Sequence, residues 1–443
     1  MQQRAPVLLD KCLRPIHLWS IAVGLVISGE YFGWSYGWNA AGTVGFLLST
    51  TFVAIMYTTF VFSFTELTTA IPNAGGPFAY ATKAMGPWAG FIAGYAALIE
   101  FLFAPPAIAL ALGSYAHFIF PQITVIQASV SVFFVFSAIN LLGVKHTARF
   151  ELIVTLIAVA ELVVFIGIVG PHFKLNNFLV DPYPAGVSGV FAAIPYAIWF
   201  FLAIEGVAMS AEEVRNPEKD IPKGYISGII TLVILAFAVM LASGGVGDWR
   251  SLSQMDYPVP EAMAMALGHD HPLVKALAGI GIFGLVASLN GIIYSCSRQV
   301  FALARSGFLP KSLSQINRRF KSPHWAIGTG WIVGVISLLS GKTNELITLS
   351  ALGAVFMYVV SMISLFVLRH QQPNLTRPFR VPFYPWFPGV ALSFSAVSLL
   401  AIIYYNPGTA LIFFTLLIVG SIYYGFRMRS GAIDFRSFEC VGE

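Results

Sequence analysis

Residues 26–34 read Val26-Ile27-Ser28-Gly29-Glu30-Tyr31-Phe32-Gly33-Trp34 and lie within a long apolar segment, residues 16–41. Two glycines flank a carboxylate about halfway along this segment. Glycine lets the backbone leave a helix, and inside a membrane irregular backbone persists only where it lines a cavity. An ionisable residue at that depth is costly and is a candidate for a functional site. We therefore interpret the stretch as a break in a membrane helix where a substrate binds. The alternative is that Glu30 pairs with another helix for packing.

The composition is that of a protein with many membrane spans. The chain has 443 residues, of which 57% are hydrophobic and 10% are charged, and its mean hydropathy is +0.78. A soluble domain carries charge on about a quarter of its residues. The three cysteines, Cys12, Cys296 and Cys440, have neither disulfide-framework nor metal-ligand spacing. We expect no metal and no cofactor.

Apolar runs of roughly 20 residues predict twelve membrane-spanning helices. They cover residues 16–41, 43–70, 86–120, 124–142, 147–170, 189–214, 221–243, 272–306, 323–339, 346–368, 385–405 and 408–427. An even number of spans places both termini on the same side. The N-terminal segment has no small-residue cleavage site and is too long for the apolar core of a signal peptide.

The positive charges indicate which side that is. All but four of the 25 lysine and arginine residues fall on the side of the N-terminus, the exceptions being Lys174, Arg250, Lys275 and Lys342. Because cytoplasmic loops carry the excess of Lys and Arg, we predict a multi-pass protein of the cell membrane, in bacteria the inner membrane, with both termini in the cytoplasm. The basic run 298–321 is then a cytoplasmic loop, and we expect no nucleic-acid partner.

The segment 189–214 is the counterpart of 16–41. Glu205-Gly206 again places a carboxylate beside a helix-breaking residue at mid-depth. The two segments are five spans apart, as expected when two five-helix repeats of opposite topology each begin with a broken helix. Such a pair of broken helices is typical of a transporter site.

This pattern predicts one integral membrane domain, residues 1–443. Residues 16–170 form the first inverted repeat, residues 189–368 form the second, and residues 385–427 add two C-terminal helices.

Other polar residues in apolar segments have two interpretations each. Glu100 lies beside the proline pair 105–106, Glu161 lies in the span 147–170, and Asn290 lies in the span 272–306. Each can line a substrate pathway or pair with a neighbouring helix. The aromatic run Trp199-Phe200-Phe201 can close over a ligand or serve ordinary packing.

Several motifs resemble a known family. They are Glu66-Leu67 with Ile71-Pro72-Asn73-Ala74-Gly75-Gly76-Pro77, Gly143-Val144-Lys145, Glu212-Glu213-Val214-Arg215-Asn216-Pro217 with Asp220-Ile221-Pro222, and Ser297-Arg298 with Ala304-Arg305-Ser306-Gly307-Phe308-Leu309-Pro310. With these motifs nearly the whole chain resembles the amino acid–polyamine–organocation transporters. The resemblance implies an all-α membrane protein with twelve transmembrane helices, a five-plus-five inverted repeat with broken first and sixth helices, and two C-terminal helices. It also implies a secondary transporter rather than an enzyme.

Within that family the chain is most similar to the ethanolamine permeases. The residues that carry this likeness are Ile27-Ser28-Gly29-Glu30-Tyr31, Leu98-Ile99-Glu100 with Ala104-Pro105, and Phe201-Leu202-Ala203-Ile204-Glu205-Gly206-Val207-Ala208-Met209. The family's amino acid carriers have a Gly-Ser/Thr-Gly triplet in the first helix that holds the substrate carboxylate. Here the triplet reads Ser28-Gly29-Glu30.

A fixed carboxylate at that position repels a substrate carboxylate and attracts an ammonium group. At about 4 Å and an effective dielectric constant near 20, the like-charge energy is roughly 4 kcal/mol. The predicted function is therefore uptake of ethanolamine, as a protonated primary amine, by alternating access. A permease for another small amine or a neutral amino acid is one alternative. A membrane enzyme or sensor acting on an amino-alcohol is another, although no HExxH or GxSxG motif is present.

The predicted site gathers residues from the two breaks and from neighbouring helices. The substrate-binding set is Ser28, Gly29, Glu30, Tyr31, Gly33, Glu100, Leu202, Ala203, Glu205, Gly206 and Asn290; the gating set is Trp199, Phe200 and Phe201; and the candidate proton sites are Glu100 and Glu161. We expect Glu30, Glu100 and Glu205 to meet, with Glu30 ionised as counter-ion to the ammonium and Glu100 protonated. Some proton-coupled relatives carry a lysine where this chain has Ala158, so proton coupling and exchange both remain open.

Overall fold

The computed structural model describes residues 11–142, 147–317, 319–320 and 322–429. Within them every regular element is helical, apart from one isolated bridge between Leu13 and Val214. The motif at 143–145 and the terminal residues 1–10 and 430–443 lie outside the described residues.

The described part confirms an all-helical membrane protein. Nine of its helical segments are long and apolar enough to span a membrane. They are α3 (Tyr36–Ala70), α5 (Pro87–Ile119), α7 (Thr147–Val169), α10 (Ile194–Trp199) continued by η2 (Ile204–Glu213), α11 (Pro217–Val246), α14 (Pro272–Arg305), α16 (Thr343–Gln371), α17 (Trp386–Tyr405) and α18 (Pro407–Arg429). Two shorter apolar helices are α6 (Val125–Leu141) and α15 (His324–Leu338). Because a bilayer cannot hydrogen-bond to the backbone, apolar runs of this length become helices.

The first predicted span is a broken helix rather than a continuous one. It consists of α1 (Pro15–Val26), the single turn α2 (Ser28–Tyr31), a non-helical stretch and the start of α3. The long element α3 itself contains a kink at Gly42, whose φ of 71° lies outside the helical region. Residues 16–41 and 43–70 are thus the two sides of this kink, as the sequence predicted.

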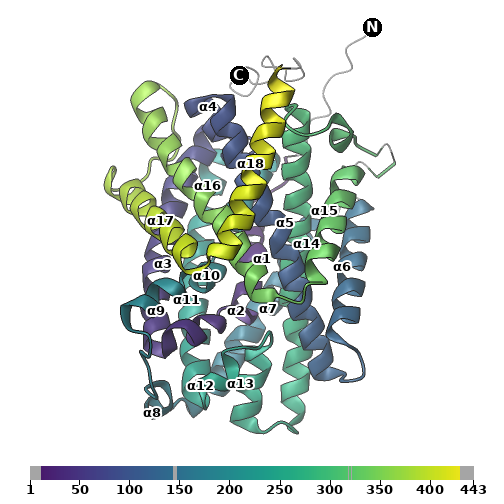
Figure 1. Cartoon of the computed structure of the whole chain (residues 1–443), viewed down its shortest axis with the longest axis vertical. Helices are drawn as coiled ribbons and strands as arrows, with labels where there is room; N and C mark the ends of the chain where they lie inside the picture. The colour runs from purple at the N-terminus through teal and green to yellow at the C-terminus, as the bar shows by residue number, and fades with distance from the viewer. Residues whose placement is uncertain (1–10, 143–146, 318, 321, 430–443) are drawn as a thin grey trace.

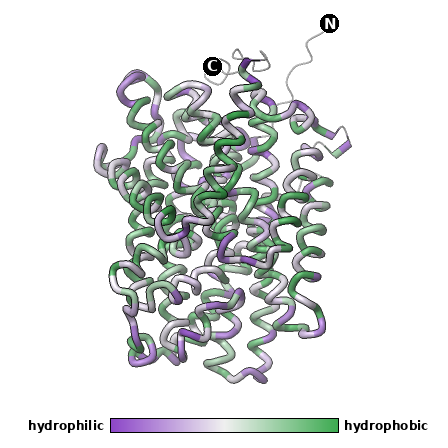
Figure 2. The backbone as a smooth tube through the Cα atoms, viewed as in Figure 1, coloured by the Kyte–Doolittle hydropathy of each residue, from purple (hydrophilic) through white to green (hydrophobic). Residues whose placement is uncertain are grey.

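Short helices connect the long ones. They are α4 (Pro77–Met85), η1 (Gly170–His172), α8 (Leu175–Phe178), α9 (Gly186–Ala192), α12 (Trp249–Leu252), α13 (Pro258–Leu267) and η3 (Lys311–Ser314). Figure 1 shows α4 and the C-terminal end of α18 at one end of the molecule and α8, α12 and α13 at the other. Hydrophilic residues are most frequent near these two ends (Figure 2).

Burial separates the central helices from the peripheral ones. In the most apolar window of α5, 89% of the residues are buried inside the protein, against 28% for α18. Exposed apolar residues such as Leu400, Leu411 and Ile422 lie on α17 and α18, where lipid covers them. The last two helices are therefore a scaffold at the edge, and α5 lies at the centre of the bundle.

The end that carries α4 is held together by a buried ion cluster. Glu66, near the end of α3, accepts two hydrogen bonds from Arg369 of α16, at 2.7 and 2.6 Å, and one from the backbone N–H of Val381. Arg377 adds a second cation at 3.3 Å. We call Glu66, Arg369 and Arg377 the Glu66 clamp. It joins the first quarter of the chain to the last.

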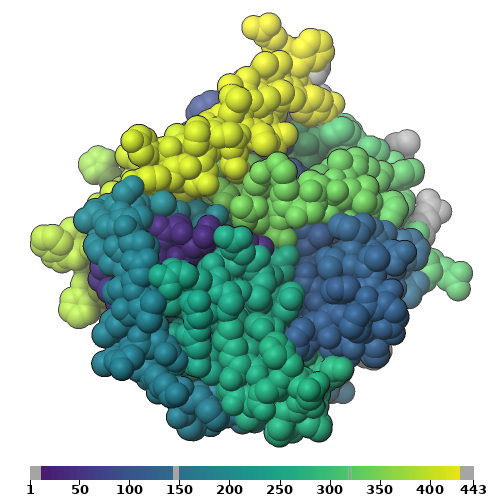
Figure 3. Space-filling view, turned by 60° about the horizontal axis from the view of Figure 1, so that its bottom comes forward, coloured from purple at the N-terminus to yellow at the C-terminus, as the bar shows by residue number. Residues whose placement is uncertain are grey.

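The opposite end is covered by the loop that contains α12 and α13. In Figure 3, which brings this end forward, teal-green residues cover the centre of the face, between the blue and the darker teal segments. Asp256 of this loop accepts hydrogen bonds from Tyr36 at 2.7 Å and Thr343 at 2.9 Å. Burial raises the pKa of the Asp256 carboxyl, and these two hydrogen bonds oppose the rise. The loop is thereby fastened to the start of α3 and the start of α16.

Candidate functional site

The backbone break between α1 and α2 is made by a hydroxyl group from α14. The N–H of Ser28 donates to Ser288 Oγ at 3.0 Å, and Ser288 Oγ donates to the carbonyl of Gly24 at 2.7 Å. In a continuous helix the Ser28 N–H would bond directly to the Gly24 carbonyl. A side chain that enters the hydrogen-bond ladder is a recognised cause of helix kinks. Ser288, which the sequence analysis did not single out, therefore helps to hold the first helix open.

Removing that hydroxyl is expected to close the ladder or leave two buried backbone groups unpaired. Ser288→Ala should lower the free energy of unfolding by about 1–3 kcal/mol and reduce substrate uptake about tenfold. Thermal unfolding in detergent and uptake into proteoliposomes measure the two effects. Ser288→Thr, which keeps the hydroxyl, is the control, and uptake by Ser288→Ala equal to that of the wild type would contradict this role.

The second break in the first helix lies after Tyr31. Phe32 is extended, with φ −159° and ψ 171°, and Gly33 is left-handed, with φ +86°. Only glycine adopts that conformation without strain. A Cβ atom at Gly33 would also come within 2.6 Å of the Trp199 ring. The predicted role of Gly33 in the break is thus consistent with the backbone, whereas Gly29 stays helical within α2.

Gly29 instead allows the two broken helices to touch. A Cβ atom at Gly29 would overlap the carbonyl oxygen of Trp199 and come within about 3.0 Å of the Phe200 Cα atom. Both obstacles are backbone, which cannot rotate out of the way. The two breaks are therefore in direct contact, at the point where α2 crosses the end of α10.

The break in the sixth predicted span is not where the sequence placed it. α10 ends at Trp199, residues 200–203 form turns, and Ala203 is left-handed with φ 76°. Gly206, the predicted break point, lies inside η2 and has no positive φ. A Cβ atom at Gly206 would come within 2.7 Å of Leu25, so this glycine serves close packing against α1. Alanine has the highest helix propensity of all residues, so Ala203 adopts the unusual conformation because its surroundings impose it.

Two carbonyl groups at this break accept hydrogen bonds within the protein. The carbonyl of Ala203 accepts from the N–H of Gly206 at 3.0 Å, and that of Glu205 accepts from Tyr225 at 3.2 Å. Leu202 is buried, with 4% of its surface exposed. The carbonyls of Ala203 and Glu205 therefore each already accept one hydrogen bond within the protein.

Two of the three predicted carboxylates lie together. Glu100 of α5 faces the carboxyl group of Glu205 and the backbone of Ala203, although neither Glu100 oxygen has an aligned donor among the described residues. Glu205 Oε2 accepts a hydrogen bond from Tyr358 of α16 at 2.8 Å, and Tyr358 contacts the hydroxyl of Tyr57 at 3.0 Å. All of these side chains are fully buried. Two facing buried carboxyl groups are best satisfied when they share one proton.

Glu30 lies apart from this pair. It is fully buried, and neither of its carboxylate oxygens has a hydrogen-bond partner among the described residues. The interactions of Glu30 involve neither Glu100 nor Glu205. The expected meeting of three carboxylates is therefore corrected to one pair and one separate group.

Tyr31 points toward α7. Its hydroxyl donates to Glu161 Oε2 at 2.7 Å and lies 3.0 Å from the carbonyl oxygen of Ala158. The hydroxyl of Tyr115 in turn donates to the Tyr31 carbonyl at 3.0 Å. Glu161, a candidate proton site, is thus connected directly to α2.

The predicted gating aromatics pack against aromatic residues of the first break and of α3. Trp199 meets Phe32 edge to face, Phe200 stacks on Trp34, and Phe201 lies against Tyr57. All three members of the run are buried, at 2% exposure or less.

Asn290 does not belong to this group. It accepts a hydrogen bond from Asn140 of α6 at 2.9 Å. Between the two interpretations given above, the structure supports pairing between helices.

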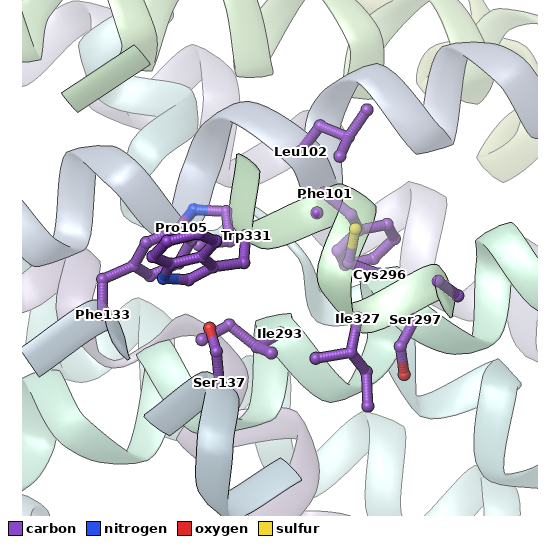
Figure 4. A pocket seen from close by; sticks show the side chains of 12 residues that line it. Phe101, Leu102, Pro105, Phe133, Ser137, Ile293, Cys296, Ser297, Ile327 and Trp331 are labelled. Carbon is purple, nitrogen blue, oxygen red and sulfur yellow. The ribbon is translucent and has the colours of Figure 1, made fainter. Parts of the chain in front are cut away.

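A cleft lies between α5, α6, α14 and α15, beside the carboxylates but not among them. In Figure 4, Phe133 and Trp331 lie beside Pro105 on one side of it, and Phe101 and Cys296 lie on the other. No carboxyl group lines this cleft. It lacks the charge that an ammonium ligand needs, so we do not assign the substrate to it.

The comparisons with known proteins agree with this architecture. The family model described as "Amino acid permease" matches residues 17–430. An uncharacterized transporter of Rhizobium meliloti is 28% identical over 95% of this chain and 92% of its own. A branched-chain amino acid permease of Bacillus subtilis is 27% identical over 82% and 81% of the two chains. A methylthioribose transporter of the same organism is 27% identical over 84% and 83%.

Proposed function

The chain belongs to the amino acid permease family of membrane transporters, and we propose that it takes up ethanolamine, as a protonated primary amine, by alternating access. Its relatives are named as transporters and permeases rather than enzymes. The observation that carries the substrate proposal is Glu30, a buried carboxylate without a partner at the break of the first helix.

A bound cation would stabilise the unpaired carboxylate of Glu30. A carboxylate removed from water without a partner is strongly destabilising, because its hydration is lost and nothing replaces it. A bound ammonium group supplies the missing charge and up to three hydrogen-bond donors. A zwitterionic amino acid would bring its own carboxylate into the same space and lose several kcal/mol to repulsion.

The Glu100–Glu205 pair complements this arrangement. Tyr358 donates to Glu205, so Glu205 acts as an acceptor and the proton of the pair is best placed on Glu100. With one proton shared, the pair carries a single negative charge and Glu30 carries another. This supports the predicted roles of Glu30 as counter-ion and Glu100 as the protonated partner.

The surroundings of the site suit a carrier that opens at one end at a time. The Asp256 loop closes the end near α13 through Tyr36 and Thr343. At the other end, the backbone N–H groups of Cys12 and Leu13 donate to the carbonyl of Glu213. We infer that Trp199, Phe200 and Phe201 move when the end near α13 opens and closes. In a bacterial cell that outer side would be the periplasm, with both termini in the cytoplasm and the 16–170 and 189–368 repeats related by inversion.

A neutral amino acid remains the second candidate. The observation in its favour is that a similar protein is named as a branched-chain amino acid permease and another, 26% identical over 67% of both chains, as a D-serine/D-alanine/glycine transporter. A binding protein that senses an amine without moving it is a third, and flux alone separates it from a carrier.

Competition in proteoliposomes tests the substrate. Labelled ethanolamine should accumulate, and close primary amino-alcohols should displace it. Alanine, glycine and serine should compete at least about 100-fold more weakly, because a repulsion of about 4 kcal/mol corresponds to more than two powers of ten. Empty liposomes are the control. If the amino acids displace ethanolamine as well as its own analogues do, the electrostatic argument is wrong; binding without any flux would favour the sensor.

A further inference from the structure

The helix α7 carries two buried carboxyl groups, and each contacts a different half of the broken first helix. Glu161 accepts the hydrogen bond of Tyr31 in α2. Glu151 lies against Gly24 of α1, where a Cβ atom would overlap its Oε1 atom. Both glutamates are about 4% exposed. Because they are ten residues apart on one helix, they are separated by about 15 Å along its axis.

Each of these carboxyl groups faces a different end of the protein. Glu161 lines a cavity with Val259, Pro260 and Met263 of the loop that covers one end. Glu151 lies near the start of α7, where Arg149 interacts with His17 at the start of α1. By the orientation proposed above, Glu161 is the outer group and Glu151 the inner one.

Glu151 has no hydrogen-bond partner among the described residues, and Glu161 has one. Both oxygens of Glu151 are buried without a hydrogen-bond donor among the described residues, so a glutamate is a costly choice where an apolar residue would fill the same space. Intramembrane carboxyl groups of this kind are common in proton pathways. Glu161 keeps a single hydrogen bond, and its donor is the last residue of the α2 turn.

From this geometry we infer that Glu161 and Glu151 are the outer and inner proton-binding sites of a proton-coupled transport cycle. One proton enters at Glu161 from outside and one leaves at Glu151 to the cytoplasm for each amine carried. Thr155, whose hydroxyl donates to the carbonyl of Ser20 at 3.2 Å, lies between the two on the α1–α7 interface. Together with water admitted when the halves of the first helix separate from α7, it connects the two sites.

Proton binding at Glu161 changes the hydrogen bond that the Tyr31 hydroxyl can make. The ionised carboxylate accepts a hydrogen bond from the Tyr31 hydroxyl. The protonated acid must itself donate a hydrogen bond, so it competes with the Tyr31 hydroxyl for acceptor oxygen atoms. Tyr31 immediately precedes the extended residue Phe32 and the left-handed Gly33. A proton at Glu161 is therefore sensed at the break where the amine is proposed to bind.

Several other titratable groups lie on elements packed against α7 or near it. They are His17 of α1, Glu30 and Tyr31 of α2, Glu218, Lys219, Asp220, Lys223 and Tyr225 of α11, Glu261 of α13, Lys275, Tyr294, Cys296, Arg298 and Arg305 of α14, and His172 of η1, with Tyr115 of α5 nearby. Of these, Tyr31 and Tyr115 interact with Glu161. Glu261 lies instead near His269, at 3.6 Å.

The experiment compares two modes of transport in the same proteoliposomes. Ethanolamine uptake is driven by an acidic exterior with the membrane potential clamped, and is then measured as counterflow without a pH gradient. In the wild type the gradient should raise initial uptake several-fold. In Glu161→Gln and in Glu151→Gln the pH gradient should no longer raise uptake. The ratio of uptake from an acidic exterior to counterflow should then equal the ratio measured when no pH gradient is imposed. Because the ratio is internal to each preparation, a poorly folded fraction does not alter it.

Four further variants complete the test. Glu161→Asp and Glu151→Asp keep a titratable group and should retain the gradient response at a shifted pH. Tyr31→Phe should shift the pH of half-maximal uptake, which a purely structural loss would not do. Glu261→Gln, outside both sites, should behave as the wild type.

The outcomes separate this inference from the proposed function on which it rests. Wild-type uptake that ignores the pH gradient overturns proton coupling while leaving ethanolamine transport intact. A glutamine variant with the wild-type ratio overturns the assignment of that residue. Absence of any ethanolamine flux in the wild type overturns the proposed substrate, and the same ratio can then be measured with an amino acid that is transported.

Discussion

Glu30→Gln is expected to bind ethanolamine about 30-fold to several thousand-fold more weakly than the wild type. Removing one partner of a buried charge pair costs roughly 2–5 kcal/mol, and each 1.4 kcal/mol is a factor of ten in affinity. The glutamine fills the same volume, so the protein should still fold and insert. Binding of labelled ethanolamine to purified protein measures the loss.

The matched variant is Glu100→Gln. An amide at position 100 mimics the protonated acid, because it can donate a hydrogen bond to Glu205 in the same way. We expect this variant to keep ethanolamine affinity within a few-fold and to change its dependence on pH. If Glu100→Gln abolishes binding and Glu30→Gln preserves it, the two roles are reversed and the amine lies nearer to α5.

Gly29→Ala is expected to reduce uptake strongly. Even a single methyl group at this position would overlap the backbone of Trp199, so the two broken helices would have to separate. Overpacking of this kind costs about 1–3 kcal/mol of stability, and the displacement falls where the site is built, so uptake should drop more than tenfold.

The control for that substitution is Gly389→Ala. Gly389 lies in α17 and has no atom within 4 Å of the position where its Cβ would be, so uptake should be unchanged. Thermal unfolding in detergent and uptake in proteoliposomes are compared for both variants. Normal uptake by Gly29→Ala would show that the contact between the two breaks can relax without loss of function.

The membrane-spanning helices could be predicted from the sequence because length and apolar composition suffice. The span predicted at 147–170 is α7, Thr147–Val169, and the one predicted at 385–405 is α17, Trp386–Tyr405. Both follow from the thickness of the bilayer, which fixes how many apolar residues a helix needs. The family was predicted from motifs at the ends of these helices, and this assignment is confirmed.

The interior of the site could be predicted only in part. Gly33 was recognisable because glycine is the residue that adopts a positive φ at low cost. Ala203 was not, because its left-handed conformation comes from contacts made elsewhere in the fold. The roles of Ser288, Tyr57 and Tyr358 depend on partners far away in sequence. A hydroxyl in an apolar helix is too common a feature to single them out.

The separation of Glu30 from the Glu100–Glu205 pair was likewise beyond the sequence. All three residues are carboxylates at mid-depth in helices expected to meet. Which side of a one-turn helix faces which neighbour depends on the backbone on either side of it. At Ser28–Tyr31, that backbone is set by the Ser288 hydroxyl and by Phe32–Gly33.

The Glu66 clamp has a consequence for how the protein is made. Glu66 emerges early from the ribosome, but its partners Arg369, Arg377 and Val381 are more than 300 residues behind it. Until they arrive, the end of α3 carries a buried acid without a counter-charge, which prevents stable docking of α3. Insertion of the helices into the membrane can proceed one by one, but final assembly has to wait for the segment that follows α16. A chain truncated before that segment would therefore remain an incompletely assembled substrate for membrane quality control.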